Sequence, residues 1–359
     1  MQWHTFKPKL CLARSIGFQI SAISLGLRLN QITEIEERFR LSSSSDELVV
    51  DDFIDAIFKA AEILNDALYP VLGMRLASKT IRSQFQGHTV YQICSMIVSI
   101  LMEAREEDGS WTKQIEKRTQ SQSKSMQAWY LFDRLKGEWG NAGDSRLFNR
   151  IWSLDESQQN SKYVLSSFYE NAPPRNLMEL QLESWFADEL EKQHSKRQLI
   201  SSETKLILRF FYSSKVSFGH HYSKEFQLDH LIPLSWWKSL FKSVNQDASG
   251  PINCVGILAL MSKEDHDTKG TMLPTDWFKS EVLPSGKSFA ERCIKDYFLV
   301  DHNEFDFARP ISVLKETRKL RKSELEKILR SFAAVCIDRW NIMKEDLLGS
   351  LYGETPEGK

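Results

Sequence analysis

Four polar residues in the second half of the chain have the types and spacing needed to hydrolyse a phosphodiester. Asp229 and His230 are adjacent inside an apolar run. Asn253 lies at the start of a second apolar run, and His266 follows that run in a polar segment. A carboxylate and an imidazole can ligate a divalent cation, a neutral His can deprotonate water, and an Asn side chain can orient that His. The set therefore predicts metal-dependent hydrolysis of a phosphate ester.

Each of these residues also has an ordinary structural interpretation. A lone His in a strand, such as His230, is more often a core residue than a base, and Asn253 could simply end a turn. His266 could be a solvated helix residue, or Asp265 or Asp267 could face the metal in its place. The functional interpretation is favoured because independent cues agree within one short stretch of sequence.

The segments around these residues read LDHLIP (228–233), INCVGILALMS (252–262), DHDTKG (265–270) and LPTDWF (273–278). Over residues 226–280 they resemble the His-metal finger, or HNH, nuclease family. Within that family they are most similar to the region that closes GmrSD-type, DUF1524 proteins of bacterial anti-phage defence. The family pattern is an acid or His and then His on a first strand, an Asn-x-x-Gly-x-Leu second strand, and a helical Asn or His before Lys. The resemblance extends loosely to the flanking helices and to Arg339-Trp340.

This resemblance implies a role for each of the four residues. Asp229 and His266 would be metal ligands, His230 would be the general base, and Asn253 would orient His230. The expected activity is endonucleolytic cleavage of DNA that leaves 5′-phosphate and 3′-hydroxyl ends, with Mg²⁺ as the expected cation. Relatives often have Asn at the position of His266, and an imidazole there would favour Mn²⁺, Ni²⁺ or Zn²⁺ over Mg²⁺.

The resemblance also bears on partners. GmrSD-type proteins usually carry a ParB-like nucleotide-binding domain, and residues 1–225 show no match to its motifs. The chain has no Gly-rich phosphate loop either. We therefore expect DNA and a separate ParB-like sensor/NTPase subunit as partners, with this chain as the effector of a restriction system.

Other functions and states stay open at the level of sequence. One alternative is a non-catalytic helical interaction subunit of a nucleic-acid or defence complex, with a degenerate HNH unit. A nuclease directed at RNA is another. Homo-oligomerisation is also left open, because no motif in the chain describes an oligomer interface.

Basic residues near the candidate site could contact a nucleic-acid backbone. Lys269 follows His266 by three residues and so shares its helix face, although a solvated lysine is the equal alternative. The run KETRKLRK at 315–322 has five basic residues and one acid, and a charged helix face is the commoner meaning of such a run. The predicted nucleic-acid contacts are Lys269, Arg318, Lys319, Arg321 and Lys322.

Periodicity predicts the elements that must position these residues. Amphipathic spacing predicts helices over 46–68, 76–105, 177–190 and 204–212 and a long helix over 311–349, with a polar loop at 119–125. Strand signals are nearly absent before residue 226. Strands are expected from Phe226 and over 252–261, followed by helices capped by Ser262 and Thr275. Trp236, Trp237 and Trp277 flank the site, and packing explains them better than base stacking.

These elements predict a mainly α fold with three regions. Residues 1–225 form a mostly helical body that recognises nucleic acid or binds a partner. An HNH ββα-metal unit occupies 226–280. Residues 281–359 form C-terminal helices that pack on the body. The basic segment 1–33 is expected to pack on a core rather than act as a cleavable signal.

Composition limits the class of protein. The chain has 359 residues and a net charge of −1, so a nucleic acid must be bound by a local basic patch rather than by overall charge. Its five cysteines form no CxxC pair, which argues against a disulfide framework and suits a reducing cytoplasm. No stretch approaches the roughly 18 consecutive apolar residues of a membrane span, so a soluble cytoplasmic protein without a membrane partner is expected.

Overall fold

The computed structural model describes residues 14–42, 48–72, 89–103, 122–139, 143–155, 160–163, 171–192, 199–215, 226–244, 250–280, 293–309 and 320–353. These residues are mainly helical, which confirms the mainly α part of the predicted fold. The chain divides into two compact units, Met1–Arg175 with Leu351–Gly353 and Asn176–Ser350 with Glu354–Lys359. The boundaries expected at 225/226 and at 280/281 both fall inside the second unit.

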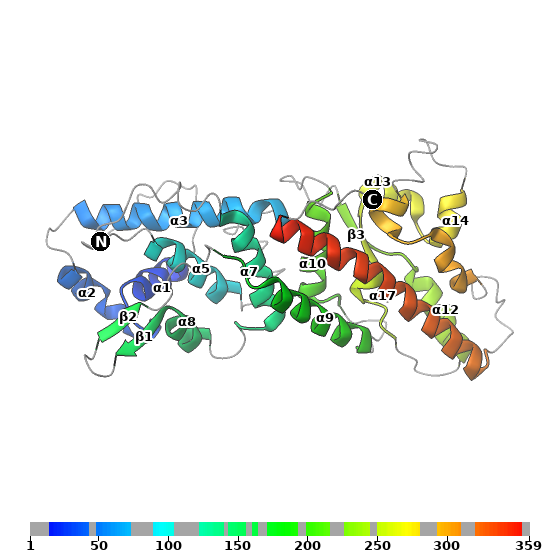
Figure 1. Cartoon of the computed structure of the whole chain (residues 1–359), viewed down its shortest axis with the longest axis horizontal. Coiled ribbons are helices and arrows are strands. Elements are labelled where there is room, and N and C mark those ends of the chain that lie inside the picture. Colours follow the sequence, from blue (N-terminus) through cyan, green and yellow to red (C-terminus); the bar gives the residue numbers. More distant parts are fainter. Residues whose placement is uncertain are drawn as a thin grey trace. The chain divides into compact units, whose positions relative to one another are not determined.

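The first unit is built from helices and one short strand pair. Its described elements are α1 (Arg14–Ser24), η1 (Leu29–Glu34), α2 (Ile35–Ser42), α3 (Leu48–Leu72), α5 (Thr89–Glu103), α7 (Ser123–Lys136), α8 (Gly143–Ile151), β1 (Trp152–Asp155) and β2 (Asn160–Tyr163). Helix α3 packs against both α5 and α7, and its length is evident in Figure 1.

Two sequence predictions for the first unit are confirmed. The helix expected over 46–68 is α3, whose residues Phe53, Ile57, Leu64 and Leu68 are buried as the spacing requires. The N-terminal segment contributes α1, which packs on α5 and α8. Of the helix expected over 76–105, α5 covers Thr89–Glu103, and residues 76–88 lie outside the described residues.

Two other predictions for this unit are wrong. Ser123–Ser125, expected in a loop, form the first turn of α7, because polar residues suit a helix start and the apolar period begins directly after them. Strands β1 and β2 pair in antiparallel fashion from Trp152↔Tyr163 to Asp155↔Asn160, although no strand was expected here. A strand of four residues is too short for the alternation of apolar and polar residues to be recognised in the sequence.

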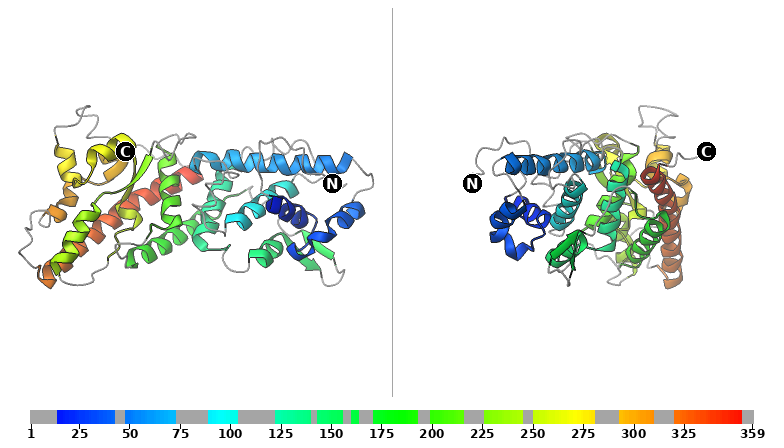
Figure 2. Two further views of the ribbon diagram at one scale, coloured as in Figure 1. Left: turned by 180° about the vertical axis from the view of Figure 1, so that it is seen from behind. Right: turned by 60° about the vertical axis from the view of Figure 1, so that its left-hand side comes forward.

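The second unit places a two-stranded hairpin among helices. Its described elements are α9 (Arg175–Glu191), α10 (Ser202–Ser213), β3 (Phe226–His230), α12 (Leu234–Val244), η3 (Val255–Ile257), β4 (Leu258–Ser262), α13 (Lys263–Lys269), α14 (Pro274–Lys279), η4 (Cys293–Phe298), η5 (His302–Ala308) and α17 (Lys322–Tyr352). Helices α9 and α10 confirm those expected over 177–190 and 204–212. Figure 2 shows the long α17, in red, from two further sides.

Strands β3 and β4 are antiparallel, with Asp229 opposite Ala259 and His230 opposite Leu258. Strand β4 begins later than predicted, because residues 255–257 form a 3₁₀ turn, so Asn253 precedes the strand rather than belonging to it. Ser262 ends the strand and caps α13, since its hydroxyl accepts the Asp265 backbone N–H at 3.1 Å. That predicted cap is confirmed.

The cap predicted at Thr275 is wrong. Helix α14 begins at Pro274, so Leu273 is the N-cap and Thr275 lies inside the first turn. Proline is favoured at the first helical position because its missing N–H would have no partner there. The Thr275 hydroxyl instead donates to the His302 carbonyl at 2.8 Å.

Helix α17 supplies the core of the second unit. A long helix was expected over 311–349, but α17 begins only at Lys322, since Leu320 and Arg321 are described and are not helical. Residues 310–319 lie outside the described part. Trp340 of α17 stacks on Phe186 of α9 with centroids 4.8 Å apart. Trp237 of α12 meets Phe332 of α17 edge to face. As predicted, Trp236, Trp237 and Trp277 are buried in packing.

Among the residues that the structure describes, no helix has the length and hydropathy of a membrane span.

Candidate functional site

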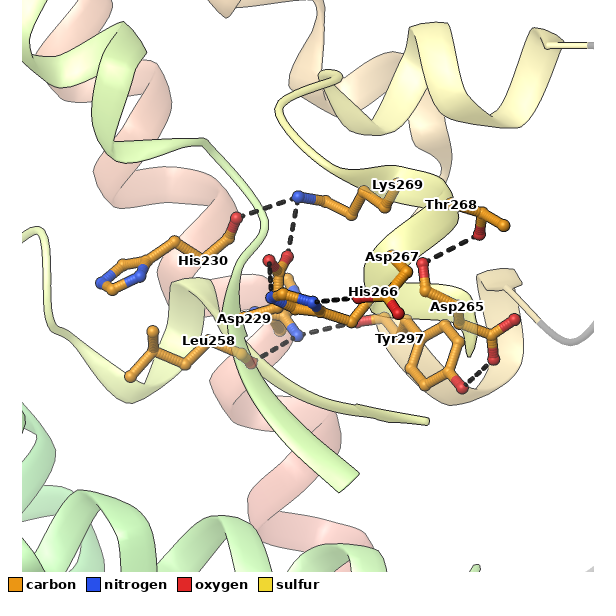
Figure 3. Close-up of polar contacts among 10 residues, drawn as sticks. Asp229, His230, Leu258, Asp265, His266, Asp267, Thr268, Lys269 and Tyr297 are labelled. Atoms are coloured by element: carbon orange, nitrogen blue, oxygen red, sulfur yellow. Dashed lines mark hydrogen bonds and ion pairs between the residues drawn. The ribbon is translucent and has the colours of Figure 1, made fainter. Parts of the chain in front are cut away.

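The candidate site forms where the end of β3 faces α13. Asp229 is buried, whereas its neighbours on β3 are partly exposed. Its Oδ2 atom lies 2.7 Å from Nζ of Lys269, and its Oδ1 atom lies 3.7 Å from Nε2 of His266. Figure 3 shows both α13 side chains reaching the Asp229 carboxylate. The Asp229 carboxylate therefore faces both the Lys269 ammonium and the His266 imidazole.

The local sequence explains why these side chains converge. Ser262 starts α13 immediately after β4, which holds the helix next to the hairpin. His266 and Lys269 are three residues apart, so both project from the same face of this short helix. Lys269 Nζ also donates to the His230 carbonyl at 3.1 Å. This bond ties the helix to the end of β3.

His230 and Asn253 form a second pair. Nε2 of His230 lies 3.0 Å from Oδ1 of Asn253 across a separation of 23 residues. Because an amide oxygen only accepts hydrogen bonds, Nε2 must carry the proton, which leaves the Nδ1 lone pair available as a base. Figure 3 shows the His230 ring extending away from the Asp229 carboxylate, as expected for adjacent residues in a strand.

The surroundings of His230 favour its neutral form. Burial lowers the pKa of the imidazole below 6.5, and the nearby Lys269 ammonium lowers it further. The Asn253 hydrogen bond and the Asp229 carboxylate raise the pKa and only partly oppose this shift. A neutral imidazole at pH 7 is the form that can accept a proton.

Lys269 differs from its predicted role as a phosphate contact. Its side chain is 0% exposed and bonds to Asp229 and to the His230 carbonyl. Burial lowers the pKa of the ammonium, and the Asp229 carboxylate raises it and partly offsets that effect. The structure therefore places Lys269 as an internal ion-pair partner, because a buried cation is held by a counter-charge and a carbonyl rather than by solvent.

The two acids that rival His266 as metal ligands point elsewhere. Asp265 is buried, and its Oδ2 accepts a hydrogen bond from the hydroxyl of Tyr297. Asp267 is exposed, and its Oδ1 lies 3.5 Å from Nδ1 of His266. A carboxylate beside Nδ1 favours the tautomer in which Nε2 carries the lone pair. His266 thus keeps the orientation expected of a ligand.

The residues fit a divalent cation held by two protein atoms. Within the described residues, no group of three or more His, Cys, Asp or Glu side chains is gathered around one point. Asp229 Oδ1 and His266 Nε2 lie 3.7 Å apart and are an oxygen and a nitrogen donor of the kinds that divalent cations accept, so these two residues would hold the cation.

Arg339 is a positioning residue whose contacts the sequence did not reveal. This fully buried side chain on α17 donates to the carbonyls of Gly256 and Leu258, which flank the start of β4, and to those of Tyr297 and Phe298. The guanidinium group of arginine has five N–H donors in a fixed planar arrangement, so it can donate to several carbonyl oxygens at once. Only the resemblance at Arg339-Trp340 marked this position.

Of the other predicted nucleic-acid contacts, the structure describes only Arg321 and Lys322. Both are exposed at the start of α17, where the Arg321 backbone N–H donates to Glu324. Arg318 and Lys319 lie outside the described residues.

Comparison with known proteins gave no match. No protein-family model matches the chain, and no curated protein or solved structure matches it. The chemistry of the site is therefore the basis for assigning a function.

Proposed function

We propose that the chain is a metal-dependent endonuclease of HNH type that hydrolyses phosphodiester bonds in DNA. One observation carries the proposal: the hairpin and helix gather Asp229, His230, Asn253 and His266 into two adjoining pairs. Lys269 joins the pairs, because it bonds to the Asp229 carboxylate and to the His230 carbonyl. The hairpin and α13 would then be the ββα-metal unit.

In this proposal His230 is the general base. Its Nδ1 atom would take a proton from the attacking water, while Asn253 holds the Nε2–H tautomer in place. The lowered pKa keeps the imidazole neutral at pH 7. Asp229 and His266 would hold the cation, which when bound supplies charge stabilisation at the phosphate and at the leaving oxygen.

A plasmid cleavage assay with the full-length protein tests the proposal. We expect nicking of supercoiled DNA in Mg²⁺ or Mn²⁺, none in EDTA, and a loss of at least about 100-fold in His230→Ala. His302→Gln is the matched control, because His302 belongs to the same unit but contacts Phe278 rather than the site. Circular dichroism would establish that both variants are folded.

Two outcomes would contradict the proposal. Cleavage that survives in His230→Ala would remove His230 as the base. Failure of the wild type to cleave any substrate, including single-stranded DNA and RNA, would favour the non-catalytic interaction subunit. Cleavage of RNA alone would support the proposed hydrolysis of phosphodiester bonds but would replace DNA by RNA as the substrate.

The proposed defence role comes from the sequence resemblance, and it has a separate test. Phage plating on bacteria that express the wild type should fall relative to bacteria that express His230→Ala. If protection appears only when a ParB-like sensor protein is co-expressed, the split-system hypothesis is supported. Equal plating on both strains, with or without that protein, would count against it.

A further inference from the structure

We infer that Lys269 is an internal counter-charge that weakens divalent-cation binding at Asp229, so that the cation binds tightly only together with a phosphodiester anion. The inference rests on the proposed metal site. Its test measures cation binding and requires no DNA cleavage.

The geometry assigns the two oxygens of Asp229 to different partners. Oδ2 is 2.7 Å from the Lys269 ammonium, while Oδ1 faces His266 Nε2 at 3.7 Å. The carboxylate can therefore offer a cation only Oδ1, and bidentate binding is blocked. Lys269 cannot swing into solvent, because its side chain is fully buried and Nζ also bonds to the His230 carbonyl.

Charge counting shows the consequence. The Asp229–Lys269 ion pair has no net charge before a cation arrives, so a divalent ion bound to Asp229 gives the pair a net charge of +2. Without the lysine, the Asp229 carboxylate would have a net charge of −1 before the cation arrives and would attract it. Like charges a few ångströms apart repel strongly in a protein interior. A phosphodiester anion on the cation would reduce the excess positive charge.

Replacing the charge while keeping a donor isolates this effect. In Lys269→Gln the amide can still donate to Asp229 or to the His230 carbonyl, but the ammonium is gone. We expect the Kd for Mn²⁺, measured at about pH 8 from the electron paramagnetic resonance signal of free Mn²⁺, to fall at least about tenfold below that of the wild type. Lys263 is an exposed lysine on the same helix, and the Kd of Lys263→Gln for Mn²⁺ should stay within twofold of the wild-type value.

A second measurement uses the unaltered protein, so it does not depend on the folding of a variant. Dimethyl phosphate, a small phosphodiester anion, should lower the wild-type Kd for Mn²⁺ at least threefold. Asp229→Asn should weaken Mn²⁺ binding at least about tenfold both with and without dimethyl phosphate, which would place the cation at this carboxylate.

The results would separate this inference from the proposed nuclease. An unchanged or weaker Mn²⁺ affinity in Lys269→Gln would overturn it, and so would a wild-type affinity that dimethyl phosphate leaves unchanged. Tighter Mn²⁺ binding in Lys269→Gln without any DNA cleavage by the wild type would support the role of Lys269 and remove only the nuclease. Where Lys269→Gln fails to fold, the dimethyl phosphate measurement alone decides.

Discussion

At the scale of single residues, two neighbours on β3 have different electrostatic environments. Asp229 is paired with the Lys269 ammonium, whereas His230 is desolvated and bonded to a neutral amide. Desolvation favours the neutral form of the His230 imidazole. In the proposed function, the strand would thus carry a metal ligand and a neutral base at adjacent positions.

In the proposed nuclease, the lowered pKa of His230 would set the pH dependence of cleavage. Because only the neutral imidazole accepts a proton, the rate should rise as pH increases through a midpoint below 6.5 and stay level above it. The measurement is single-turnover plasmid nicking between about pH 4.5 and 8.5 at saturating Mg²⁺. A midpoint above 6.5, or a profile with no rise, would contradict the assignment of the base.

Asn253→Ala should separate orientation from basicity. The variant loses the bond that holds the Nε2–H tautomer, so we expect a roughly 10- to 100-fold lower cleavage rate. That bond also raises the pKa of His230, so the midpoint of the pH profile should move further down. A variant with the wild-type rate and midpoint would show that Asn253 only shapes the turn.

At the scale of elements, the position of the hairpin depends on α17. Arg339 bonds to the Gly256 and Leu258 carbonyls, and the backbone of Cys336 lies directly against Gly256. A Cβ atom at Gly256 would overlap that backbone, so only glycine allows the loop to approach the helix so closely. The segment that joins Asn253 to β4 is thereby held against α17.

Gly256→Ala tests this close approach. The added methyl group must displace backbone, so we expect the unfolding free energy of the second unit to fall by about 1–3 kcal/mol, measured by urea denaturation. Gly137→Ala is an informative comparison. A Cβ atom added at Gly137 would meet no atom within 4 Å, but its φ is +65°, so the cost there would come from backbone conformation alone. A Gly256→Ala protein as stable as the wild type would show that α17 can shift.

At the scale of the whole molecule, the site belongs entirely to the second unit. The four predicted catalytic and metal-binding residues lie between Asn176 and Ser350, while α3, α5 and α7 form the core of the first unit. Each unit has its own buried apolar side chains. Units with separate cores can open separately, so a single free energy of unfolding need not describe the chain.

Leu64→Ala tests this separation. Leu64 is fully buried on α3, and its truncation should lower the stability of the first unit by roughly 2–5 kcal/mol. Hydrogen exchange with mass spectrometry should show lost protection in α3, α5 and α7. The opening free energies of peptides from β3, β4 and α17 should stay within about 0.5 kcal/mol of their wild-type values. Equal losses in both sets would mean that the chain unfolds as one cooperative body.

Features that depend on near neighbours could be predicted from the amino-acid order alone. Apolar spacing along α3, α9 and α10 predicted those helices, and Ser262 predicted the start of α13, because periodicity and capping involve residues three or four apart. Asp229, His230, Asn253 and His266 were also chosen from sequence, by residue type and by resemblance. The short pair β1 and β2 was missed because four residues carry too little pattern.

The partners of the buried charges, in contrast, emerge only from the folded chain. Lys269 could equally have faced solvent, yet it lies against Asp229 and against the carbonyl of His230, 39 residues earlier. Arg339 reaches Gly256 across 83 residues. A buried charge must find a counter-charge or acceptors wherever the chain brings them, and contacts at such separations leave no local period in the sequence.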